Sequence, residues 1–245
     1  MSEEEPFYPD LCTELHQRTL KAHDTSNKLV NLKLLVALTD AKLYGLVLKD
    51  FYYVFQAIED SLEVYQCQDE EFILALRNPR WYRASQLAQD VTFFLGPDWR
   101  KQNPPSPAAV KYVDRINYVM EKEPVLIFAH AQTMFMAALA GGQILKKIVR
   151  KGLGLTGSDG LLFFEFPDDN VVSVKADIRS SVNGLKMEKK MIDRVVAEKE
   201  LIFQLNNGIA ANVELSLMSF RRIGMFLLIC IVICLLLVVV VKMCF

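Results

Sequence analysis

The 245-residue chain is poor in the residues that usually hold metals or disulfides, with five cysteines and three histidines. Three of the cysteines lie in or beside an apolar segment at 223–241, and no Cys-x-x-Cys pair occurs. A disulfide framework and a structural zinc site are therefore not expected. The candidate ligands that remain are His16, His23 and His130.

Other signals are missing as well. The glycines at Gly152-Leu153-Gly154 lack the Gly-Lys-Ser/Thr of a phosphate-binding loop, and the net charge of −1 argues against nucleic acid as a partner. The acidic residues 1–9 contain no apolar core of a signal peptide, and no prenylation motif is present. Strand signals are scarce, which leaves an all-α fold as the expectation.

Apolar residues recur at helical spacing along most of the chain. Asn103-Pro104-Pro105-Ser106-Pro107 breaks the chain between two of the periodic segments. We expect one all-α domain over 10–217, preceded by an acidic tail at 1–9. Beyond a first helix that opens at Pro9-Asp10, the predicted helices span 41–65, 85–94, 107–120, 124–151 and 188–217.

The segment 218–245 differs from the rest. Residues 223–241 carry no charge, and 19 residues of helix span about 28 Å, enough to cross a bilayer core. Arg221 and Arg222 precede this stretch and favour a cytosolic position for the domain. The sequence therefore predicts a C-terminal transmembrane helix that acts as a tail anchor.

A run of small residues, Ala137-Ala138-Leu139-Ala140-Gly141-Gly142, interrupts the predicted helix at 124–151. Positions 137, 138, 141 and 142 share one helix face, and paired glycines favour a kink. Bare backbone on that face permits either close helix packing or the approach of a flat ligand. This segment alone does not separate the two.

A histidine on the first helix and a glycine kink in another helix indicate a ligand only when they are considered together. One imidazole on a first helix and a glycine-kinked helix elsewhere could hold a flat metallomacrocycle, with the imidazole as an axial iron ligand. Lys175 and Arg179 lie four residues apart on one helical face and could bind two carboxylates, although a solvated face is the better explanation of the pair taken alone.

Several separate motifs have the spacing of a known family. The chain resembles the eukaryotic membrane-anchored haem oxygenases over about 10–217, with the anchor in addition. The motifs that carry the resemblance are Ala129-His130-Ala131-Gln132-Thr133, Gly141-Gly142-Gln143-Ile144-Leu145-Lys146-Lys147, Phe94-Leu95-Gly96-Pro97-Asp98-Trp99, and Arg179-Ser180 followed by Asn183, Leu185 and Met187.

The resemblance implies roles for individual residues. His23 would be the proximal ligand of the iron in haem b, and Phe203 would line the pocket. Gly141 and Gly142 would lie on the distal helix over the haem. Lys175 and Arg179 would bind the propionates, and His130 would be structural.

The resemblance also implies an activity: the opening of haem to biliverdin, Fe²⁺ and CO with O₂. The electrons would come from NADPH through a flavoprotein partner of the cytochrome P450 reductase type. The implied location is the endoplasmic reticulum membrane, and biliverdin reductase is a further implied partner. The basic residues Lys146, Lys147, Arg150 and Lys151 either complement a helix C-terminus or help to bind the electron donor.

The chain departs from the family pattern on the distal helix. Ala138 stands where the family has an aspartate that organises the water supplying protons, and Met134 replaces a basic residue. Gln132 stands at a common tyrosine position. On the first helix, His16 and Leu20 replace lysines, and we expect Arg18 and Lys21 to compensate as propionate contacts.

These departures leave three functions open. The first is a haem oxygenase with a modified proton supply. The second is a haem-binding protein that does not cleave the ring, acting as a sensor, a store or a weak peroxidase. The third is a helical membrane adaptor that binds no haem.

Overall fold

The computed structural model describes residues 10–37, 40–64, 70–166 and 170–212, and the elements within these ranges are helical. The predicted acidic tail at 1–9 and the predicted membrane segment at 218–245 lie outside the described residues. The four longest helices are α1 (Leu11–Ala37), α2 (Ala41–Val64), α6 (Pro107–Lys122) and α10 (Lys189–Ala211).

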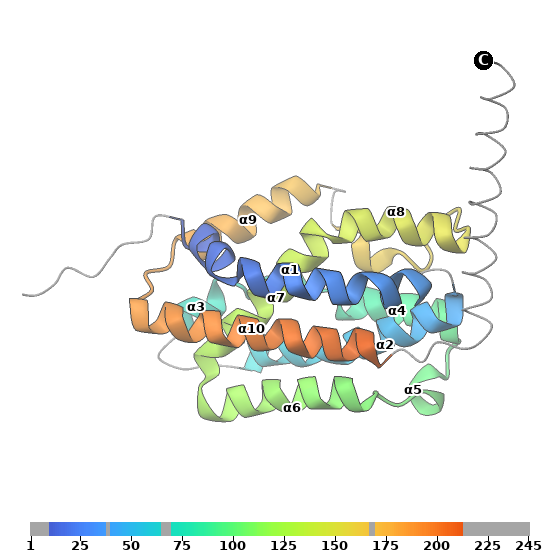
Figure 1. The fold of residues 1–245 in the computed structure, drawn as a ribbon, viewed down its shortest axis with the longest axis horizontal. Helices are drawn as coiled ribbons and strands as arrows, with labels where there is room; N and C mark the ends of the chain where they lie inside the picture. The colour runs from blue at the N-terminus through green and yellow to red at the C-terminus, as the bar shows by residue number, and fades with distance from the viewer. Residues whose placement is uncertain (1–9, 38–39, 65–69, 167–169, 213–245) are drawn as a thin grey trace, which may run out of the picture.

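The long helices pack nearly side by side. Figure 1 shows α1 along α10 across the middle of the molecule, with α6 at one edge. The helices α8 (Gly142–Leu153) and α9 (Val171–Asn183) lie at the opposite edge. The helix α2 contacts α6 on one side and α4 (Ala84–Leu95) on another. This arrangement leaves α7 (Ile127–Ala140) in the interior, where eleven of its residues are buried.

Local chemistry explains where several helices begin and end. The Ser106 hydroxyl accepts a hydrogen bond from the Ala109 N–H at 3.2 Å, and Pro107 occupies the first turn of α6. The Asn170 side chain accepts from the Ser173 N–H at the start of α9. Gly154 ends α8 with a φ of 67°, which glycine adopts without strain.

The predicted helix at 124–151 is divided into three parts. It comprises a 3₁₀ turn, η1 (Pro124–Leu126), then α7, and then α8 after Gly141. The segments 124–140 and 142–153 are bent by 52° relative to each other. The paired glycines therefore produce a kink, as their low helix propensity predicts.

Short elements join the long ones: α3 (Glu70–Leu74), α5 (Trp99–Gln102) and η2 (Leu162–Phe164). Close packing of α2 on α4 depends on Gly45, because a Cβ at this position would lie 2.8 Å from the Phe94 Cβ. No single helix in the described ranges is long and apolar enough to cross a membrane; the bent pair 124–140 and 142–153 meets that requirement only when taken together.

Candidate functional site: a cleft between α1 and the bend of α7 and α8

Two adjoining cavities form a cleft beside the bend. The first has a volume of about 240 Å³ and is bounded mainly by apolar side chains of α2, α7, η2 and α10. The second has a volume of about 430 Å³ and extends toward α9. The cavities meet at the four residues that line both: His23, Ala137, Leu145 and Phe203.

One wall of the cleft carries the predicted iron ligand. His23 lies on α1, and its ring packs edge-on against Phe203 with centroids 5.7 Å apart. The His16 ring lies 5.9 Å from the His23 ring, but His16 lines only the second cavity. Of the two histidines on α1, His23 is therefore the one placed where the cavities join.

The opposite wall is the bend itself. Ala138 and Gly142 line the first cavity, Gly141 lines the second, and Ala137 lines both. A Cβ on Gly141 would meet only the Ala137 carbonyl oxygen, at 3.5 Å, whereas a Cβ on Gly142 would lie 3.1 Å from the Phe164 ring. The small residues thus leave the backbone accessible from the cleft.

A carboxylate fixes the aromatic side of the first cavity. Asp90 on α4 accepts hydrogen bonds from the Leu162 and Phe163 N–H groups at 2.9 and 2.8 Å. Burial raises the pKa of Asp90 to about 6, although these two hydrogen bonds oppose the shift. The contacts hold η2 so that the rings of Phe163 and Phe164 form part of the lining.

The two predicted propionate contacts on α9 lie together. Lys175 and Arg179 both line the second cavity, as their spacing on one helical face predicts. Arg179 already pairs with Asp10 at 2.7 Å and donates to the Thr13 hydroxyl at 3.2 Å. Lys175 has no carboxylate partner among the described residues.

Of the remaining predicted site residues, two line the cleft and two do not. Gln132 lines the second cavity and Phe203 lines both. Arg18 pairs with Asp193 at 2.7 Å, and Lys21 is exposed; neither is among the residues lining the two cavities. The structure therefore does not bring Arg18 and Lys21 to the cleft.

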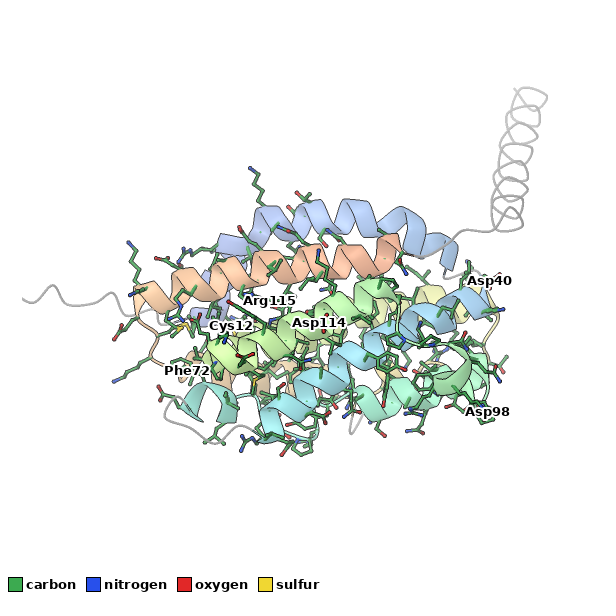
Figure 2. All side chains as sticks on the ribbon, turned by 90° about the horizontal axis from the view of Figure 1, so that it is seen from below. Cys12, Asp40, Phe72, Asp98, Asp114 and Arg115 are labelled. Atoms are coloured by element: carbon green, nitrogen blue, oxygen red, sulfur yellow. The ribbon has the colours of Figure 1, made fainter. Side chains whose placement is uncertain are left out.

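His130 is buried outside the cleft in an ionic network. Its Nε2–H donates to the Glu198 carboxylate at 2.9 Å, and Arg115 donates to the same carboxylate from α6. Figure 2 shows Arg115 on α6 beside α10. Burial lowers the pKa of His130, so the imidazole is a neutral donor. Burial opposes ionisation of Glu198, but the hydrogen bonds from Arg115 and His130 lower its pKa to about 2.

Two further residues line the cleft that the sequence did not predict as site residues, Tyr44 and Lys199. Tyr44 lines the first cavity, and its hydroxyl is buried and has no hydrogen-bond partner among the described residues. Lys199 lines the second cavity and is only 5% exposed. A signal for Lys199 was present, since it falls on the apolar stripe of Val195 and Ile202.

Comparisons with known proteins agree with this architecture. A family model described as heme oxygenase matches residues 9–212. A heme oxygenase of Rhodella violacea is 30% identical over 219 residues, covering 89% of this chain and 92% of the relative.

Two solved structures have the same fold. The structure of heme oxygenase-2 from Synechocystis sp. PCC 6803 in complex with heme and NO has a TM-score of 0.76, at 30% identity over 83% of this chain and 85% of the other. That of heme oxygenase-1 from the same cyanobacterium in complex with heme has a TM-score of 0.79, at 27% identity over 91% and 99%.

The chain therefore belongs to the haem oxygenase family and is a haem-degrading enzyme. The predictions of the family, of the all-α fold and of haem as the substrate are confirmed at this level. The roles of individual cleft residues stay predictions.

Proposed function

We propose that this chain opens haem b to biliverdin, Fe²⁺ and CO through a distal pocket that has no carboxylate at position 138. The reaction consumes O₂ and electrons that a flavoprotein reductase transfers from NADPH. The observation that carries the proposal is the cleft, which His23 lines together with the small residues of the bend and which is mainly apolar in its first cavity.

The residues of the cleft fit a haem. An imidazole on one wall and bare backbone on the other leave room for a flat ring, and Phe51, Phe55 and Phe163 supply apolar surface. Two residues that line the first cavity, Tyr44 and Asn206, each carry a buried oxygen that has no partner among the described residues, the Tyr44 hydroxyl and the Asn206 Oδ1. A ligand with polar groups or ordered water would satisfy both atoms.

The residues have separate tasks in this proposal. When bound, haem would supply the iron at which O₂ is activated. His23 would hold that iron, and Phe203 restrains the imidazole by edge-on packing. Gly141 would admit the ring close to the backbone, and Gly142 lets α8 pack against Phe164 at the edge of the first cavity, whose apolar lining excludes water.

Tyr44 is the residue proposed to supply polarity in place of the aspartate. Burial raises the pKa of Tyr44 well above its usual value, and the charge of Asp90 acts in the same direction. The phenol therefore keeps its proton at neutral pH and can donate a hydrogen bond inside the first cavity. Ala138 and Met134, which also line this cavity, provide no such donor.

A second function is consistent with the same observations. The apolar Ala138 and Met134 also suit a protein that binds haem without cleaving the ring, as a sensor, a store or a weak peroxidase. The experiment that separates the two measures CO released per haem by the full chain with NADPH and reductase. We expect release near one CO per haem, and at least a tenfold lower rate in Tyr44→Phe with haem affinity kept. Intact haem after many reduction cycles would support the second function.

The proposed contact with the reductase lies on α8. Lys147, Arg150 and Lys151 are exposed there, whereas Lys146 pairs with Glu165 at 3.2 Å. Exposed cations would attract an acidic partner and lose effect at high salt. Charge reversal at Lys147 and Arg150 should slow reductase-driven turnover at low salt and leave turnover driven by a chemical reductant unchanged. Equal rates with reductase would reject this surface.

The proposed location is the endoplasmic reticulum membrane, with residues 223–241 as the span and biliverdin reductase as an enzyme that takes up the product on the cytosolic side. The uncharged, apolar composition of 223–241 supports a membrane span at this segment. Removing residues 218–245 should release the protein from the membrane fraction, and retention would reject the anchor.

A further inference from the structure

Lys199 is a buried cation that has no acidic partner among the residues that the structure describes. It lies on α10, is 5% exposed, and its Nζ donates to the Thr133 hydroxyl at 3.0 Å and to the Gln132 side-chain oxygen. Both partners are neutral. The buried Lys49 shows the usual arrangement, since its Nζ lies 3.0 Å from the Asp50 carboxylate.

The surroundings of Lys199 are positively charged. The described residues that line the second cavity include Lys175, Arg179 and Lys199 but no aspartate or glutamate. Arg179 is compensated by Asp10, which leaves the charges of Lys175 and Lys199 without a carboxylate among the described residues. An isolated ammonium group is costly to bury, and burial lowers the pKa of Lys199 to about 8.

The hydrogen bonds of Lys199 also indicate an anionic partner. An ammonium group has three donors, and the described contacts use two of them, to Thr133 and Gln132. Both acceptors lie on α7 and line the second cavity beside Lys199. A negatively charged oxygen in that cavity would accept the third hydrogen bond and balance the charge.

We infer that Lys199 binds a carboxylate of the tetrapyrrole substrate at the buried end of the second cavity, while Lys175 serves the more exposed end. The inference rests on the proposed function, because the carboxylates that Lys199 and Lys175 would bind are the propionates of haem. It assigns the inner anchor to α10 in place of Arg18 and Lys21, which do not line the cleft.

The experiment compares haem with haem dimethyl ester, in which both carboxylates are blocked. Affinities are measured by absorbance titration of the full chain in detergent, for the wild type, Lys199→Met and Lys147→Met. We expect the wild type to prefer haem, and Lys199→Met to lose about tenfold of that preference with little change in its affinity for the ester. Lys147→Met removes an exposed lysine outside the cleft and should keep the preference.

A second variant guards against misfolding. Lys199→Gln keeps a donor for Thr133 but removes the charge, so it should fold and show the same reduced preference. If both variants keep the wild-type preference for haem over its ester, Lys199 only joins α7 to α10 and the inference is overturned. Failure of the wild type to bind either porphyrin would instead overturn the proposed function.

Discussion

The buried carboxylates of this molecule are stabilised by different kinds of partner, and the difference can be measured as a change in the free energy of unfolding. Glu198 is held ionised by Arg115 and the neutral His130, whereas Glu59 accepts only backbone N–H groups, those of Arg83 at 2.6 Å and Ala84 at 3.0 Å. An ion pair holds a buried charge more firmly than backbone dipoles do. We therefore expect substitutions at the two sites, Glu198 with its partner Arg115 and Glu59, to change stability in different ways.

Arg115→Met should lower the free energy of unfolding by about 2 to 3 kcal/mol, because it leaves the buried Glu198 carboxylate without its cationic partner. Arg18→Met is the matched control: its pair with Asp193 is largely exposed and should contribute less than about 1 kcal/mol. Urea unfolding followed by circular dichroism measures both. Equal losses in the two variants would contradict a special role for the buried pair.

The ionisation of Glu59 should make the free energy of unfolding depend on pH. Burial outweighs its two backbone hydrogen bonds and raises the pKa of Glu59 from 4.5 to about 7. An acid with a raised folded-state pKa contributes stability that is present below its unfolded pKa and is lost as the pH rises through the folded value.

Relative to the wild type, Glu59→Gln should therefore gain stability as the pH rises from 5 to 8, by about 2 to 3 kcal/mol in total. The amide oxygen of glutamine can still accept from the Arg83 and Ala84 N–H groups. Urea unfolding across this range tests the prediction. A difference between the proteins that stays constant with pH would contradict ionisation of Glu59 in the folded state.

At the scale of elements, the bend between α7 and α8 makes the cleft. Gly141 faces open space in the second cavity, while Gly142 is packed against Phe164. The two adjacent glycines thus differ in function. One leaves room for a ligand and the other permits contact between α8 and η2.

Gly141→Leu should weaken haem binding at least tenfold, because the side chain would enter the second cavity, while the melting temperature of the protein without haem stays near that of the wild type. Gly141→Ala is the graded control and should keep haem affinity while raising stability by up to about 1 kcal/mol. Absorbance titration and thermal unfolding measure the two effects. Unchanged affinity in Gly141→Leu would place the ligand elsewhere.

The two histidines of α1 lie two turns apart, so the helix can present either ring to the second cavity. His23→Ala should shift the Soret band of the haem complex and lower affinity at least tenfold, since His23 lies where the cavities meet. His16→Ala should keep the spectrum and most of the affinity. An equal spectral change in the two variants would contradict His23 as the single axial ligand.

At the scale of the whole molecule, helix positions followed from sequence more readily than the contents of the cleft. The prediction of 41–65 matches α2 at Ala41–Val64, and that of 107–120 matches α6 at Pro107–Lys122, because apolar periodicity and capping are local. The kink at Gly141 was foreseen as well. The short helices α3 and α5 were not, since too few residues carry the pattern.

The contents of the cleft depend on partners far apart in the chain. Arg18 was expected beside the ligand, yet it pairs with Asp193, 175 residues away. Lys199 falls on the apolar stripe of α10, but only the packing of α7 shows that its ammonium group donates to Gln132 and Thr133. Tyr44 reads as part of an apolar stripe, and only the folded structure shows that it lines the same cavity as Ala138 and Gly142.

The most direct test of the account is a single turnover of the haem-loaded full chain with NADPH, reductase and air, followed by absorbance. We predict that the Soret band disappears while a biliverdin band grows, to about one biliverdin per haem. That result would show that a pocket with alanine at position 138 still opens the ring. A Soret band that persists through repeated reduction would contradict the account and leave a protein that holds haem without cutting it.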